Sequence, residues 1–399
     1  MYIRIYAISA FVLLCGGVNV LEFFGWNLET NSTSLLIQLF PSSFVLISLL
    51  FWKIAVGPKR LCVENVKGVQ LLVVLGAFLL FLRYMVGFGY FSTYVNCLLL
   101  PVLIAVLYPR RDDHFVGKWS LAEFLIYGFY YAECCLAISE KLLSNNVFPF
   151  IHEAIDGVSA NTDTAFRSSA LQNHPIQNAL CVSIVMAFIL VCGGRFKYFN
   201  LLLGYLAILS FNTRSSIFAW AMIFFVGALV LAYRKRNNAL LIIKGGLLGC
   251  VLLIGVVYLV FNGGWGERLM TLGLMDDSSS QVRVQVWAIF NNQSIGKFLL
   301  PIPAVEVSRL MRFSGVEILE NYWIIYILNY GLVAVILLIF FYVRFYAELL
   351  STYALFQKFL VACVLLLISS SNNSLAVPSA ALALFSLCCI GFKRGDAVC

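Results

Sequence analysis

The chain has 399 residues, of which 62% are hydrophobic and only 12% are charged, and its mean hydropathy is +0.93. A soluble domain needs about 25% charged residues to cover its surface, so this composition excludes an ordinary soluble protein. The net charge of +8 does not indicate nucleic-acid binding, because the cations are scattered between apolar runs. Several runs approach the ~20 residues that a helix needs to cross a bilayer. We therefore predict an all-α, polytopic integral membrane protein.

Twelve apolar runs are predicted to form transmembrane helices within a single transmembrane domain that covers residues 1–399. The first run is too long for the core of a typical signal peptide and another follows it closely, so we expect no cleaved leader. In chain order, the predicted spans cover residues 5–24, 34–56, 69–87, 88–108, 119–138, 177–193, 199–213, 215–233, 241–261, 322–345, 354–372 and 377–392.

The distribution of lysine and arginine predicts the orientation of these spans. With the N-terminus inside, eighteen of the 27 cations fall on the inner side and eight on the outer side, and Arg83 lies within a span. Short basic loops mark the cytoplasmic side of a membrane protein, so we expect both chain ends in the cytoplasm. All twelve cysteines fall in spans or on the inner side, so no disulfide framework is expected.

Two long connections, 139–176 and 262–321, are predicted on the outer, periplasm-like face. Long loops in a compact protein are usually functional, so we expect the chemistry on this face. The sequence has no nucleotide-binding loop and no cluster of His and Cys with metal-ligand spacing. No cofactor and no metal are therefore expected.

Arginines at the outer ends of the spans are candidate phosphate ligands. Arg83, Arg167, Arg214 and Arg283 all fall in this region, and a planar guanidinium offers paired donors to two phosphate oxygens. An arginine at the hydrocarbon edge is also commonly an anchor that extends to the interface, which is the simpler interpretation of Arg83. Arg214 lies in a polar break between two apolar runs, which favours the lining of a cavity.

Three further residues are candidate acids or bases. Glu320 precedes a predicted span, where a carboxylate is placed either to act as a general base or to stabilise a helix N-terminus. His174 precedes Pro175 and is either a site acid or base or a hydrogen-bonded loop residue. Glu133, inside a span, is a weaker candidate acid or base, and the alternative role is pairing with an arginine.

Four motifs in this order resemble those of the O-antigen polymerase and O-antigen ligase superfamily. Residues 167–179 resemble its R…(N/H)-P-N-x-(L/F)-A stretch, and residues 211–216 resemble its T-x-S-R-(G/S) turn between two spans. Residues 283–287 resemble the R…W that opens the large periplasmic loop. Residues 320–332 resemble the (H/E)-N-x-(Y/W)-(L/I)…x-x-G-(L/I) that closes it.

This resemblance implies a glycosyltransferase C-like fold and transfer of an undecaprenyl-diphosphate-linked saccharide in the bacterial inner membrane. Arg167, Arg214 and Arg283 would bind the donor diphosphate and stabilise the leaving group, and Arg83 is a further candidate for the same role. The partners implied are the lipid-linked saccharide and membrane lipid, with a chain-length regulator as a candidate protein partner and no nucleic acid.

The closing motif separates the two activities of the superfamily. Ligases typically carry His before Asn at this motif, whereas this chain has Glu320, which favours a polymerase with Glu320 or, less favoured, His174 as the base. Asn321 and Tyr322 are the expected contacts to the acceptor sugar. The alternatives are an O-antigen ligase and a flippase or other transporter of lipid-linked oligosaccharide. Transport would require polar residues near mid-span, which most spans lack.

Overall fold

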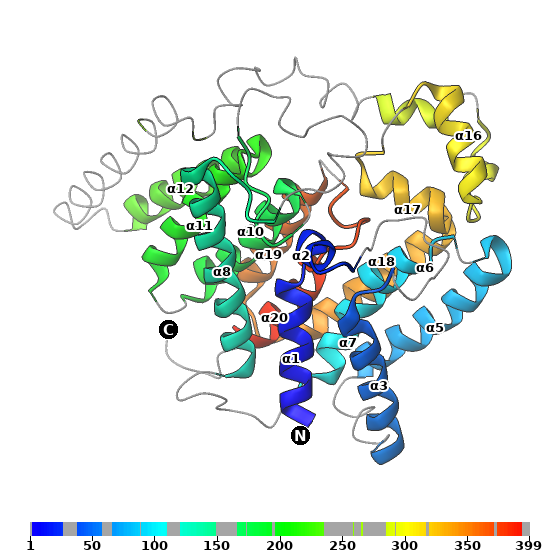
Figure 1. The fold of residues 1–399 in the computed structure, drawn as a ribbon, viewed down its shortest axis with the longest axis horizontal. Coiled ribbons are helices and arrows are strands. Elements are labelled where there is room, and N and C mark those ends of the chain that lie inside the picture. Colours follow the sequence, from blue (N-terminus) through cyan, green and yellow to red (C-terminus); the bar gives the residue numbers. More distant parts are fainter. Residues whose placement is uncertain are drawn as a thin grey trace.

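The computed structural model describes an all-helical chain (Figure 1). No strand occurs among the described residues, so the predicted all-α class is confirmed for that part of the chain. The described residues are 2–26, 38–57, 66–87, 89–109, 120–148, 166–172, 174–193, 196–234, 258, 265, 285–291, 293–316, 319–370 and 373–392.

Most of the helices overlap the apolar runs predicted from the sequence. In chain order they are α1 (Tyr2–Cys15), α2 (Val18–Phe23), α3 (Pro41–Val56), α5 (Val66–Val86), α6 (Phe91–Thr93), the π-helix η1 (Tyr94–Leu99), α7 (Leu100–Leu107), α8 (Leu121–Leu143), α10 (Pro175–Cys192), α11 (Lys197–Phe211), α12 (Arg214–Arg234), the 3₁₀ turns η2 (Val286–Phe290) and η3 (Ile295–Phe298), α16 (Ala304–Ser314), α17 (Tyr322–Tyr330), α18 (Leu332–Leu349), α19 (Leu355–Ser370) and α20 (Ala381–Gly391).

Eleven of the twelve predicted spans coincide with helical segments, and the remaining one, 241–261, lies almost wholly outside the described residues. Four helices, α5, α8, α10 and α18, are long and apolar enough to cross a membrane, and seven shorter helices are also apolar. These features are those of a membrane protein. The number of crossings and the orientation of the chain remain predictions.

Two predicted spans are interrupted by glycine. The first divides into α1 and α2 at Gly16 and Gly17, and another divides into α17 and α18 at Gly331. Gly331 has a φ of +82°, which side chains on L-residues rarely adopt. An added Cβ there would also lie 2.7 Å from the carbonyl oxygen of Leu299. The break therefore results from a turn that only glycine allows beside a neighbouring backbone.

The predicted span 88–108 is one continuous helical segment with a wider turn inside it. Residues Tyr94–Leu99 form a π-helix directly before Pro101 near the start of α7. Proline has no N–H and its ring clashes with the carbonyl four residues earlier, and a π-turn relieves this crowding. The thiol of Cys97, the residue at that position, donates to the carbonyl of Val377 at 3.1 Å.

The helices α10 and α20 form the centre of the bundle. Helix α10 packs against α8, α11, α19 and α20, and α20 packs in addition against α7 and α18. Phe188 of α10 packs edge-to-face on Phe385 of α20, with ring centroids 5.6 Å apart. By contrast, most of α5 and α18 is not covered by protein although both are apolar. Central helices are apolar all round because protein surrounds them, whereas the outer helices present apolar surface of the kind that lipid covers.

Part of the second predicted outer loop, 262–321, has structure of its own. Helix α16 and the turns η2 and η3 bury a small second core against α17, in which Val286, Phe298 and Leu310 are buried. The hydroxyl of Tyr90 donates to the carbonyl of Ile302 at 2.7 Å and ties this unit to the turn after α5. Figure 1 places α16 at the opposite end of the bundle from the N-terminal end of α1.

Local signals explain where α8 begins and why its end differs from the prediction. Ser120 and Glu123 form a capping box at its start. The helix continues to Leu143 and closes on Ser144 in the left-handed conformation. The first long connection therefore begins after residue 143 rather than at residue 139, and Glu140 belongs to the helix. The apolar pattern underestimated α8 because its last turns are polar.

Gly204 provides a test of this packing. A Cβ added at Gly204 in α11 would lie 2.2 Å from the hydroxyl of Tyr130 and 2.6 Å from the sulfur of Met186. We expect Gly204→Val to destabilise the protein by about 1–3 kcal/mol through overpacking. The measurement is the melting temperature of detergent-purified protein. Gly76→Val, on the exposed side of α5 with nothing within 4 Å, is the matched control, and equal melting of the two variants would contradict the packing described here.

Candidate functional site

Two of the predicted arginine segments lie against each other. The backbone N–H of Ser168 donates to the carbonyl of Ser210 at 3.2 Å, and the Nε of Arg167 donates to the carbonyl of Phe211 at 3.4 Å. Both acceptors belong to the last turn of α11, where carbonyls lack helical partners. Because Arg214 follows three residues after Phe211, the structure brings Arg167 and Arg214 to one end of the bundle.

The turn that leads to Arg214 is short and conformationally constrained. Asn212 ends α11 with a φ of +53°, in the left-handed region that asparagine tolerates better than most residues. Thr213 follows, and its carbonyl accepts from the N–H of Ile217 at 3.0 Å. The polar break seen in the sequence is therefore a tight helix-to-helix turn, with Arg214 as the first residue of α12.

The surroundings of Arg214 favour an anion. A cation at a helix N-terminus is opposed by the helix dipole by about 0.3–1 kcal/mol, whereas an anion there is attracted both by the helix N–H groups and by the guanidinium. The hydroxyls of Thr213 and Ser216 are also buried and have no hydrogen-bond partner within the described residues. Arg167 and Arg214 are both half-buried. This end of the bundle combines cationic and hydroxyl donors of the kind that bind phosphate oxygens.

The segment 166–172 owes its position to carboxylates of α8. One oxygen of Glu140 accepts from the hydroxyl of Ser168 at 2.5 Å and from the N–H groups of Ser169 and Ala170 at 3.1 and 2.9 Å. Glu133 accepts from the N–H of Leu171 at 3.2 Å. The two roles left open for Glu133 were an acid or base and a partner of an arginine; its hydrogen bond in the structure is to backbone.

Glu140 was missed by the sequence analysis. It was placed in a loop, because the predicted span ended at residue 138. The available signal was its spacing of seven residues from Glu133, which puts both carboxylates on one face of a helix.

His174 has a defined structural contact. It is the N-cap residue of α10, and its Nδ1 accepts from the N–H of Ile176 at 3.2 Å, with Pro175 as the first helical residue. A ring nitrogen that accepts a hydrogen bond carries no proton, so the proton of a neutral His174 ring lies on Nε2. This arrangement accounts for His174 as a cap and makes it a poorer candidate base.

The closing motif lies at the start of α17. The side chain of Asn321 accepts from the N–H groups of Trp323 and Ile324 at 2.9 and 3.4 Å, so it caps the helix. Tyr322 is buried, and its ring lies 4.5 Å from that of Trp323. Glu320 is half-buried just before the cap. The predicted sugar contacts, Asn321 and Tyr322, therefore already have roles within the fold.

Helix α19 connects this motif with the arginine pair. It packs against α17 on one side and against α10 and α12 on the other. The hydroxyl of Tyr322 lies beside Ser369 and Ser370 at the end of α19. Glu320 and Arg214 therefore precede two helices, α17 and α12, that share α19 as a neighbour.

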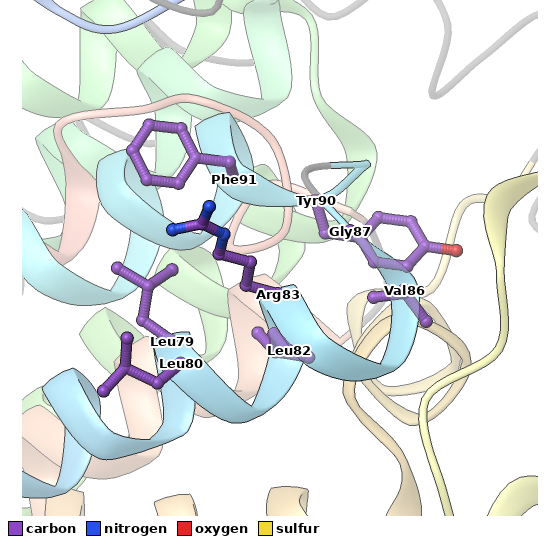
Figure 2. Close-up of a pocket in the computed structure, with 8 residues that line it drawn as sticks. All are labelled: Leu79, Leu80, Leu82, Arg83, Val86, Gly87, Tyr90 and Phe91. Carbon is purple, nitrogen blue, oxygen red and sulfur yellow. The ribbon is translucent and has the colours of Figure 1, made fainter.

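Arg83 lies apart from this arrangement. Arg83 is exposed at the end of α5, which Figure 1 shows on the opposite side of the bundle from α12. Figure 2 shows its guanidinium pointing toward Phe91 over an apolar cavity of about 110 Å³ that is lined by leucines of α5 and by Tyr90. Arg283 lies outside the described residues, although Trp287 of the same motif is exposed on η2.

No group of three His, Cys, Asp or Glu side chains that could hold a metal ion occurs in the described part of the chain. Comparison with protein-family models, with curated proteins and with solved structures found no match.

The left-handed turn before Arg214 yields a stability prediction. A positive φ costs an L-residue about 1–2 kcal/mol, and a β-branched side chain tolerates it worst. We expect Asn212→Gly to keep the melting temperature and Asn212→Val to lower it by several degrees, in thermal melts of detergent-purified protein. The control is Asn291→Val, because Asn291 has an extended backbone at φ −63° and ψ 134°. A loss at Asn291 as large as that at Asn212 would refute the conformational explanation.

Proposed function

We propose that this chain is a glycosyltransferase that uses a polyprenyl-diphosphate-linked donor, and specifically a polymerase of O-antigen or a related polysaccharide. It would transfer an undecaprenyl-diphosphate-linked glycan en bloc onto a lipid-linked repeat unit, at the periplasmic face of the bacterial inner membrane. The observation that carries the proposal is the contact between the segments of Arg167 and Arg214. The apolar helices and the order of the four motifs are consistent with it.

In the proposed reaction the arginines bind the diphosphate of the donor. The acceptor hydroxyl attacks the anomeric carbon, a new C–O bond forms, and the bond between that carbon and the diphosphate oxygen breaks. The leaving diphosphate gains negative charge as this bond breaks, and Arg167, Arg214 and Arg283 would stabilise that charge. The released proton passes to a general base, for which Glu320 is the better candidate because His174 caps α10.

Two rival functions are separated by their products. An O-antigen ligase would, when its gene is deleted, leave bare core and polymer retained on the carrier lipid, whereas deletion of a polymerase leaves core that carries one repeat unit. A flippase would move lipid-linked units without lengthening them. The deciding assay is polymerisation of purified lipid-linked repeat units by this chain alone, reconstituted in lipid vesicles.

The first prediction of this proposal concerns the arginines. Arg167→Ala, Arg214→Ala and Arg283→Ala are each expected to lower kcat/KM in that assay by roughly 100-fold or more, because each removes a donor to the developing charge. Long-chain polysaccharide should disappear from cells that still contain the protein in the membrane. Arg309→Ala is the matched control, since Arg309 is exposed on α16, and normal chain-length ladders in the Arg214 and Arg283 variants would sink the assignment.

The second prediction separates the two candidate bases. Glu320→Gln is expected to lower kcat by roughly 10²–10⁴-fold with little change in donor KM, because it removes proton acceptance and keeps the shape of the side chain. His174→Asn is expected to keep activity, since asparagine is also a good N-cap. The measurement is the initial rate of polymerisation at varied donor concentration. The opposite result, an inactive His174 variant beside an active Glu320 variant, would assign the base to His174.

A further inference from the structure

Glu140 lies at the centre of the contacts that hold the segment 166–172. It is fully buried near the end of α8. Besides its three contacts to Ser168, Ser169 and Ala170, its second oxygen accepts from the N–H of Val147 at 2.8 Å. The carboxylate thus collects four donors, one from the turn after α8 and three from the residues that immediately follow Arg167.

Other buried groups continue this support along the segment. The side chain of Asn178 on α10 accepts from the N–H of Gln172 at 2.9 Å and donates to the carbonyl of Ser169. Gly17 makes the closest backbone approach, since an added Cβ there would lie 1.8 Å from the carbonyl oxygen of Leu171. The backbone from Ser168 to Gln172 is therefore held from α8, from α10 and from the break between α1 and α2.

The backbone within the segment is held in a conformation that it would not adopt alone. Ala170 has a φ of +37° and its N–H donates to Glu140. A left-handed alanine is disfavoured and persists only where surrounding contacts determine it. Asn212, two residues before Arg214, is also left-handed. Both arginine segments therefore contain a left-handed residue, and the conformation of Ala170, which is the less tolerant residue type, is held by the Glu140 carboxylate.

We propose that Glu140 is a positioning residue that sets the place of Arg167 beside Arg214, and that it does so as a hydrogen-bond acceptor. This inference rests on the proposed function, in which the two arginines hold the donor diphosphate. Glu140 acts on the reaction through the backbone of residues 168–170. A displacement of about 1 Å in a group that binds a reacting phosphate is enough to lower a rate by roughly 100-fold.

The acceptor role makes the order of three substitutions specific. In Glu140→Gln the amide oxygen can take the place of the oxygen that accepts three donors, and only the contact to Val147 is lost. In Glu140→Asp the side chain is one methylene too short to reach the segment, although it keeps the charge. Glu140→Ala removes every contact. If Glu140 is a positioning residue, the Glu140→Gln variant should be more active than the Glu140→Asp and Glu140→Ala variants. If Glu140 acts by its charge or its proton, Glu140→Asp should be more active than Glu140→Gln.

The position of Arg167 can be measured without any assay of activity. Half-buried Arg167 should be protected from trypsin added to the outer face of spheroplasts, and Glu140→Ala should expose it to cleavage. Glu123→Gln is the matched control, because Glu123 lies on the same helix and caps its distant end. Ser168→Ala, which removes one contact of the carboxylate, is a milder variant for use if Glu140→Ala does not reach the membrane. Protection of Arg167 in the Glu140→Ala and Ser168→Ala variants alike would overturn the positioning role.

A double-mutant cycle then asks whether Glu140 acts through Arg167. We expect Glu140→Ala to lower kcat/KM by about 100-fold, with the same division between kcat and KM as Arg167→Ala. The double variant should be no worse than Arg167→Ala alone, because the interaction is already lost. If the loss of kcat/KM in the double variant equals the product of the losses in the two single variants, the proposal is overturned. If Arg167→Ala stays active while Glu140→Ala exposes Arg167 to trypsin, the proposed function is rejected but the structural role of Glu140 stands.

Discussion

Backbone that is neither helix nor strand cannot lie inside an apolar bundle unless its N–H and C=O groups find partners. In the segment 166–172, four consecutive N–H groups, those of residues 169–172, are satisfied by side chains of α8 and α10. Glu140, Glu133 and Asn178 accept its N–H groups in turn. In this segment, side chains take the place of the backbone carbonyls that accept N–H groups in a helix. These contacts hold Arg167 in position, and with it the contact between the two arginine segments.

The same constraint explains how the helices are joined. Buried tyrosine hydroxyls reach backbone carbonyls of neighbouring helices: Tyr6 bonds Ile104 at 2.7 Å and Tyr130 bonds Asn200 at 2.5 Å. Hydrogen bonds between helices in membranes contribute about 0.6 kcal/mol each, so no single one holds the bundle. Because hydrogen bonds are directional, each one fixes the position of one helix along the axis of its neighbour.

The helical class and the element order were predictable from the sequence because apolar runs of span length have few alternatives. The breaks were harder to predict. Gly331 interrupts a predominantly apolar run, and its turn is required by the backbone of Leu299 beside it, which no local pattern reveals. The end of α8 was missed for the opposite reason. Its last turns are polar, so hydropathy placed Glu140 in a loop although the residue is fully buried.

The sequence by itself determined that this protein has the composition of a membrane protein, because composition is a property of the chain alone. It also predicted that several arginines lie near the ends of the spans. It proposed Arg167, Arg214, His174 and Glu320 as candidate site residues. Only the tertiary structure decided which of these meet and which are committed to caps, as His174 is. It joined Arg167 to the last turn of α11 and made Glu140 the support of that contact. These contacts are made by carbonyls and carboxylates of helices that are separate in the sequence. Such groups come close together only after the helices have packed.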